Sequence, residues 1–88
     1  MRTVIEDPSV SAKVYAEVGI YARLEDAFDA LKWRLARNPE EGELIDDYYW
    51  LYRQKGNRDL KIPSLVVLYT FDPHYVTILA LLLKLPTI

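Results

Sequence analysis

The chain has 88 residues, enough for one domain with a small core and too few for a second domain. Hydrophobic residues make up 51% of the chain and charged residues 27%, a balance typical of folded domains rather than disordered ones. The absence of cysteine excludes disulfides, thiolate metal sites and cysteine nucleophiles. A formal net charge of −2 disfavours nucleic-acid binding by bulk electrostatics, so such binding would require local clustering of basic residues.

The sequence shows no pattern of a targeting or membrane segment. Residues 1–10 lack the apolar core of a signal peptide. The most apolar run, residues 75–83, is far shorter than the roughly 20 residues that cross a bilayer as a helix. We therefore expect a cytoplasmic protein without membrane association.

The first part of the chain predicts a weak strand and two helices. The strand is expected at residues 2–6. Asp7 and Pro8 then have the pattern of a helix start, since Asp caps free N–H groups and Pro is tolerated at the first helical position. This helix is expected to end near Gly19. The helix predicted at residues 24–38 is more clearly marked, because its apolar side chains follow the 3.6-residue period: Leu24, Ala27, Phe28, Leu31 and Leu35.

Three strands are expected next, arranged as a meander. The first covers residues 44–54, the second begins at Ser64, and a turn at residues 72–74 leads into the third at residues 75–84. The sequence therefore predicts one α+β domain over residues 1–88. Its small antiparallel sheet would consist of the meander and an additional N-terminal strand, with two helices packed on one face.

The last predicted strand is apolar on both faces. Regular alternation places Val76, Ile78, Ala80 and Leu82 on one side and Thr77, Leu79, Leu81 and Leu83 on the other. A strand with one uncovered face normally shows polar residues there. Because a chain this short has few elements to cover a second face, we predict a partner-binding surface that includes Leu79, Leu81 and Leu83.

Aromatic side chains are concentrated at residues 48–52, immediately before Arg53. Alternation places Tyr48, Trp50 and Tyr52 on the same face of the predicted strand. Planar amphipathic side chains provide binding area at a low cost in entropy, so this face is a second candidate partner-binding surface. Base stacking and ordinary packing in the sheet core are the alternatives.

Several cues occur together within residues 24–83. The predicted helix closes with residues 35–39, LARNP, and Gly42 follows. Basic residues continue through the next predicted strand and turn. The two hydrophobic strands after them contain residues 68–69 and 76–81. In their order and combination, these cues resemble the RelE/ParE superfamily of bacterial toxin–antitoxin toxins. The resemblance implies a RelE/ParE-like fold and a toxin of a type II system, neutralised by a small antitoxin and acting on the ribosome and its mRNA or on DNA gyrase.

The resemblance also implies a candidate catalytic cluster. In that family the concave sheet surface carries basic residues, and ribosome-dependent members use them, with a tyrosine or histidine near the C-terminus, to cleave mRNA through attack of a ribose 2′-hydroxyl on the adjacent phosphate. By likeness, Arg53, Lys55, Arg58 and Lys61 would stabilise the phosphate charge; the alternative is that they are solvated surface charges. No tyrosine or histidine follows Leu83, and the net charge is acidic, which favours a ParE-like toxin that acts by binding, or a toxin relative that has lost cleavage.

Two functions therefore stay open. The first is the toxin, enzymatic only if it is an mRNA endoribonuclease of RelE type; the second is a non-toxic homodimeric interaction domain of the same fold with no catalytic activity. His74 lies in a predicted turn with no second ligand or orienting carboxylate in the pattern, so neither a metal nor a small-molecule cofactor is expected. The expected partners are a small antitoxin or a second copy of the chain, with the ribosome, mRNA or gyrase as the target.

Overall fold

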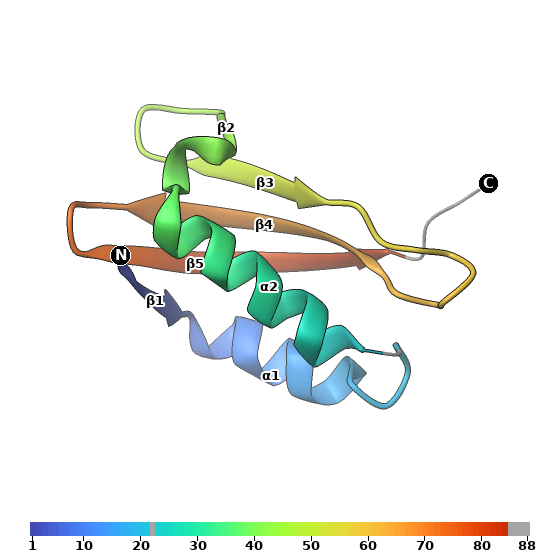
Figure 1. Ribbon diagram of the computed structural model, residues 1–88. Coiled ribbons are helices and arrows are strands. Elements are labelled where there is room, and N and C mark those ends of the chain that lie inside the picture. Colours follow the sequence, from blue (N-terminus) through green and yellow to red (C-terminus); the bar gives the residue numbers. More distant parts are fainter. Residues whose placement is uncertain (22, 85–88) are drawn as a thin grey trace.

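The computed structural model describes residues 1–21 and 23–84. In chain order, the described residues form these elements (Figure 1): strand β1 (Thr3–Glu6), helix α1 (Pro8–Glu17), helix α2 (Leu24–Arg37), a 3-10 turn η1 (Pro39–Glu41), and strands β2 (Glu43–Leu44), β3 (Trp50–Gln54), β4 (Ser64–Phe71) and β5 (Tyr75–Lys84). The predicted α+β class is confirmed. The sheet, however, has five described strands and is mixed, whereas a meander with an additional N-terminal strand was expected to be antiparallel.

The strand order in the sheet is β1-β5-β4-β3-β2. Neighbours from β2 to β5 pair antiparallel, but β1 pairs parallel with β5, and Val4 lies opposite Val76. Parallel neighbours cannot be joined by a tight turn, and here residues 7–74, which include both helices and strands β2 to β4, separate β1 from β5. The strand expected at residues 2–6 is thus present as an edge strand, in a pairing direction that the sequence pattern did not predict.

Each helix starts with a recognisable local feature. The Asp7 side chain caps α1 by accepting a hydrogen bond from the Ser9 backbone N–H at 2.9 Å, and Pro8 occupies the first helical position. Helix α2 follows Arg23, which has a left-handed backbone with φ of 59°. Acidic residues in the first turn of α2 and basic residues in its last turn match the helix dipole.

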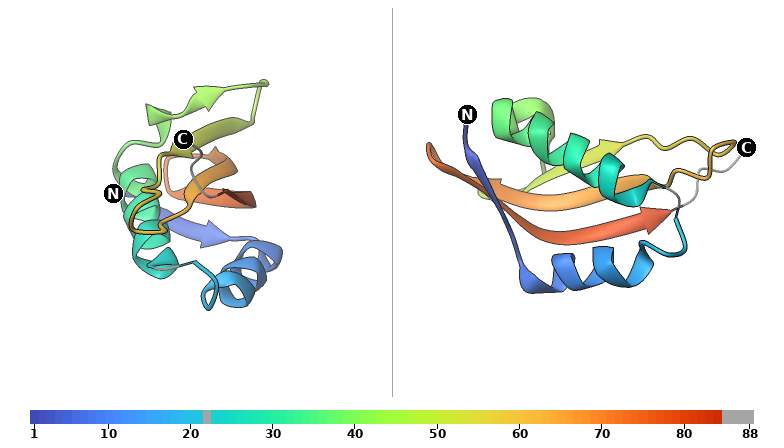
Figure 2. Two further views of the ribbon diagram at one scale, coloured as in Figure 1. Left: turned by 90° about the vertical axis from the view of Figure 1, so that its right-hand side faces the viewer. Right: turned by 60° about the horizontal axis from the view of Figure 1, so that its bottom comes forward.

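The two helices occupy different positions relative to the sheet. Helix α2 lies across one face of the sheet, and α1 lies along the sheet edge next to β5, where β1 is short (Figure 1, Figure 2). The Asp7 N–H donates to the Ile78 carbonyl at 2.8 Å, so the chain leaves the sheet at that point and α1 continues alongside β5. The other face of the sheet is not covered by any helix of residues 1–21 and 23–84.

The core fills the space between α2 and the sheet. Its most deeply buried side chains come from both helices and from strands β4 and β5: Val10, Leu24, Phe28, Leu31, Leu35, Leu65, Val67, Tyr69, Val76 and Ile78. Tyr69 keeps its hydroxyl group satisfied by donating to the Pro39 carbonyl at 2.6 Å. This apolar stripe of α2 is the one that the helical periodicity predicted.

A β-bulge interrupts the pairing of β4 with β5. Tyr69 lies opposite Ile78, but its neighbour Leu68 lies opposite Ala80, so Leu79 is an extra residue in β5. Because side chains alternate with a period of two, one extra residue moves every following side chain to the other face.

The bulge overturns the predicted alternation of the last strand. Leu81 is only 6% exposed and Leu83 packs against the core, so both face the helices. Leu82 points to the opposite side and is 58% exposed. The shared surface predicted for Leu79, Leu81 and Leu83 is therefore wrong, since the extra residue exchanges the faces after Ile78.

The continuous strand predicted at residues 44–54 is also wrong. Strand β2 ends at Leu44, a tight turn follows, and β3 begins at Trp50. In the turn, the Tyr49 N–H donates to the Asp46 carbonyl at 3.3 Å, and the Asp46 side chain accepts from the Asp47 N–H at 2.7 Å. Aspartate favours such local hydrogen bonds over a strand, which is why the pair of aspartates interrupts the pattern here.

Candidate functional site

The uncovered sheet face is the main candidate site, and we call it the open face. Residues paired across neighbouring strands point to the same side of a sheet, so the register defines this face row by row. The first central row contains Glu43, Leu51, Leu68 and Ala80, and the second contains Arg53, Val66 and Leu82. A third row, toward the β4–β5 turn, contains Ile5, Thr77 and Thr70, and a fourth row at the opposite end contains Ser64 and the charged Lys84.

Apolar side chains dominate the two central rows. Leu82 is 58% exposed, and Ala80 beside it is exposed as well. Leu51, Val66 and Leu68 are half-buried, because their neighbours in the sheet flank them while nothing described lies above them. The open face therefore presents a contiguous apolar strip from β3 to β5.

Glu43 and Arg53 are the charged members of these rows, and they pair with each other. The Arg53 Nη1 atom donates to Glu43 Oε2 at 3.1 Å, and both side chains are about two-thirds exposed at 65% and 66%. The pair lies at the β2–β3 end of the strip. The central rows consequently carry no net charge.

The four basic residues suggested as a catalytic cluster lie along the hairpin between β3 and β4. Arg53 projects from the open face, Lys55 follows the end of β3, and Arg58 and Lys61 lie near the tip. Lys61 has a left-handed backbone with φ of 58°. Arg58 Nη2 lies 3.7 Å from Asp59 Oδ1, so two of the four cations already have a carboxylate neighbour. Their charge is less available to a phosphate than the sequence suggested.

The three aromatic residues predicted to share a face are in different environments. Tyr52 is buried under α2, where its hydroxyl accepts a hydrogen bond from Arg34 Nη1 at 3.1 Å. Trp50 is half-buried, with its ring centroid 5.2 Å from that of Phe71. Tyr48 lies in the turn before β3 and is 76% exposed. The turn interrupts the alternation, so the predicted aromatic surface is not formed, although Leu44, Ile45 and Tyr49 are also exposed beside Tyr48.

Sequence reasoning did not identify Val66, Leu68 and Leu82 as surface residues. In β4 the alternating set Ser64, Val66, Leu68 and Thr70 contains two hydroxyl residues, whereas the set Leu65, Val67, Tyr69 and Phe71 is wholly apolar, so the sequence did indicate which set is covered. The side of Leu82 depends on the bulge, for which the sequence shows no glycine or other marker. The prediction of an uncovered apolar face was sound in kind, but it selected the wrong leucines.

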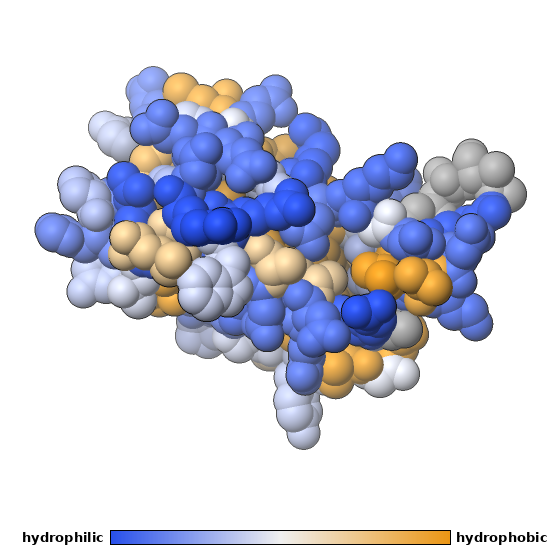
Figure 3. All heavy atoms as spheres, in the orientation of Figure 1, coloured by the Kyte–Doolittle hydropathy of each residue, from blue (hydrophilic) through white to orange (hydrophobic). Residues whose placement is uncertain are grey.

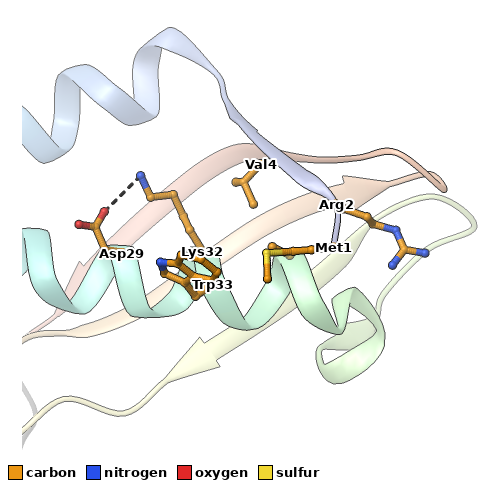
Figure 4. A pocket seen from close by; sticks show the side chains of 7 residues that line it. Met1, Arg2, Val4, Asp29, Lys32 and Trp33 are labelled. Atoms are coloured by element: carbon orange, nitrogen blue, oxygen red, sulfur yellow. Dashed lines mark ion pairs between the residues drawn. The ribbon is translucent and has the colours of Figure 1, made fainter.

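A groove of about 400 Å³ lies on the other side of the molecule, between β1 and α2 (Figure 4). Lys32 in this groove contacts Glu6 Oε1 at 2.8 Å and Asp29 Oδ1 at 3.4 Å. Burial alone would lower the pKa of Lys32, but the hydrogen bonds and charges of these two carboxylates outweigh it and raise the pKa. The lysine charge is thus neutralised within the chain and is not available to an anionic ligand.

The helix side of the molecule has a different surface from the open face. Viewed from the α2 side, hydrophilic residues predominate and apolar ones are scattered (Figure 3). Trp33 and Met1 are exposed at the groove, and Tyr15 projects from α1. Single exposed apolar residues of this kind are ordinary on protein surfaces and indicate no site.

Two kinds of feature are absent from residues 1–21 and 23–84. No three His, Cys, Asp or Glu side chains of this part of the chain come together as a metal site. None of its helices is long and apolar enough to cross a bilayer. His74 is exposed, and its backbone N–H donates to Asp72 Oδ1 at 2.7 Å within the β4–β5 turn.

No protein-family model matches the chain, and neither a curated protein nor a solved structure is significantly similar to it. The RelE/ParE resemblance therefore stays a prediction based on its sequence cues.

Proposed function

We propose that this chain is the toxin of a bacterial type II toxin–antitoxin system with a RelE/ParE-like fold, and that it acts by binding a protein. The order of elements, one strand and two helices followed by antiparallel strands, agrees with the order on which the resemblance rests. The observation that carries the proposal is the open face, because its two central rows form an apolar strip that no described part of the chain covers.

Protein binding accounts for this surface better than RNA cleavage does. Contiguous exposed apolar surface is typical of protein interaction sites. Binding to phosphates depends on unpaired lysine and arginine charges, whereas Arg53 on this face is paired with Glu43. A protein target such as gyrase therefore suits the open face better than mRNA does, and an antitoxin segment with apolar side chains would neutralise the toxin by covering the same strip.

The proposal is tested by inducing the protein alone in a bacterial host and following growth. We expect arrest with the wild type and normal growth with Leu82→Glu, which puts a charge into the apolar strip at an exposed position. Tyr15→Glu, a similar change at an exposed position on α1, is the control and should still arrest growth. Normal growth of cells that express the wild type well would contradict the toxin assignment.

A second variant separates binding from cleavage. Lys55, Arg58 and Lys61 are replaced together by Ala, which removes the three hairpin cations outside the apolar strip. If the toxin acts by binding a protein, arrest persists and mRNA stays intact in both the wild type and this variant. Loss of arrest in the variant, together with mRNA cleavage by the wild type, would instead support an endoribonuclease.

A further inference from the structure

We propose that a second copy of this chain covers the open face when no other partner is bound, in a two-fold interface of sheet against sheet. The interface follows from the pattern of residues on that face and does not require the chain to be a toxin. Three properties of the face support it: its charge, the order of its two central rows, and its size.

The charges of the two central rows, which do not include Lys84 at the end of β5, favour an identical partner over a charged one. Glu43 and Arg53 are the charged members of the central rows, and each has the opposite sign to the other. A strongly acidic or basic partner would be attracted by one of these two charges and repelled by the other, so the two contributions to its binding free energy would roughly cancel. A second copy brings the same two charges, so each copy can offer Arg53 to the carboxylate of the other.

The order of the rows makes this face complementary to itself. We place a two-fold axis in the plane of the interface, perpendicular to the strands and between the two central rows. This axis sets the first row of one copy against the second row of the other. Leu68 then faces Val66 on β4, and the small Ala80 faces the larger Leu82 on β5. Strands of the two sheets stay roughly aligned, as they do in packed β-sandwiches.

The same axis brings the charged ends of the rows together. The aliphatic part of Arg53 lies over Leu51 of the other copy, because both belong to β3 in adjacent rows. Glu43, paired with Leu51 on β2, is next to that position. Each arginine can therefore exchange its own glutamate for that of the other copy or bridge both, which keeps the charges satisfied in the interface.

The face is large enough for a stable contact. Strands at about 4.8 Å spacing and about 3.3 Å per residue give a sheet roughly 20 Å wide and, along the eight residues of β4, about 26 Å long. Its flat area is roughly 500 Å², of the same order as the about 800 Å² of accessible surface that each partner buries in a stable interface. The second copy would occupy the strip assigned to the antitoxin or target, so those partners would compete with it.

The test is the mass of the purified protein in solution, measured by sedimentation equilibrium over a range of concentrations. The wild type and the Tyr15→Glu control should reach the mass of two copies, and Leu82→Glu should stay at the mass of one copy. Circular dichroism verifies that each variant is folded. If Leu82→Glu does not fold, Leu82→Ser, which removes the apolar contact without adding a charge, takes its place and should weaken association.

A charge exchange tests the predicted pairing directly. Arg53→Glu and Glu43→Arg should each raise the dissociation constant by about tenfold or more, because like charges then meet across the interface. The two changes combined should restore most of the wild-type association. Three results would overturn the interface. The wild type could stay at one copy at its highest soluble concentration, or it could form species larger than two copies. The Leu82 variants could also keep the two-copy mass. Since the mass is measured without other partners, this result is independent of the growth assay.

Discussion

Replacing Leu81 and Leu82 by Ala, one at a time, should have very different effects on stability. The two residues are neighbours in β5, but the bulge at Leu79 directs Leu81 into the core at 6% exposure and leaves Leu82 58% exposed. A buried Leu→Ala change costs about 2 to 5 kcal/mol, since it removes apolar contact and leaves a cavity. Partial burial of Leu82 is worth at most about 1 kcal/mol. The free energies of unfolding should therefore differ by about 1 kcal/mol or more.

The comparison is made by urea unfolding, followed by circular dichroism, at a protein concentration where the wild type is monomeric. Low concentration is needed because association would add its own stability to the wild type and to Leu81→Ala. Equal slopes against urea would verify that the variants expose the same surface on unfolding. Equal losses of stability for the two variants, or a larger loss for Leu82→Ala, would show that the faces of β5 are not exchanged and would refute the assignment of the open face.

Two further predictions concern the contacts around Tyr69. Burial raises the pKa of the Tyr69 hydroxyl to about 12, although a hydrogen bond from the Gly42 backbone opposes the shift. The stability that this tyrosine contributes should therefore be complete below about pH 10 and be lost as the pH rises toward about 12. The urea midpoint should fall more steeply between about pH 9 and about pH 11 for the wild type than for Tyr69→Phe. Parallel curves of midpoint against pH would contradict the raised pKa of Tyr69. Gly42→Ala should lower stability by about 1 to 3 kcal/mol, because the added methyl group would overlap the Tyr69 hydroxyl and come within 2.7 Å of the Leu51 carbonyl oxygen. Gly19→Ala, which meets nothing within 4 Å, is the matched control, and equal melting temperatures for both glycine variants would contradict this expectation.

The features that sequence reasoning predicted well are those set by local chemistry. Helix α2 follows from an unbroken 3.6-residue apolar period, and the start of α1 follows from an aspartate cap and a proline at the first helical position. The strands after Ser64 and Tyr75 follow from long β-branched and aromatic runs. In each case the signal and the structure it specifies lie within a few residues of each other.

The features that were poorly predicted from the sequence depend on pairing between distant segments of the chain. The parallel position of β1 is set by contacts with β5, more than seventy residues later in the chain, and nothing within residues 3–6 specifies a direction. The bulge at Leu79 depends on how β4 and β5 align, and leucine has no special preference for such a position. The turn between β2 and β3, by contrast, had a local signal in Asp46 and Asp47. The neighbouring aromatic residues favour a strand, and the prediction followed them instead of the aspartates.

The same distinction applies to the candidate site. An excess of apolar residues over what one covered face needs was visible in the sequence, and it correctly indicated an uncovered apolar surface. Which leucines form that surface depended on a shift of one residue, so Leu81 and Leu83 were assigned in place of Leu82. The pairing of Arg53 with Glu43 is a contact between strands, and a count of basic residues along the chain cannot reveal it.

The central claim is that another protein molecule binds to the open face. Cysteine cross-linking tests it most directly, because the wild-type chain contains no cysteine and a single one can be placed at will. Leu68→Cys, near the proposed axis, should give a two-copy product with a bifunctional maleimide of about 10 Å, the spacing of two packed sheets. Tyr15→Cys on α1 should give little of this product. A Leu68→Cys protein that reacts with maleimide but stays at one copy, or that cross-links no better than Tyr15→Cys, would contradict the account.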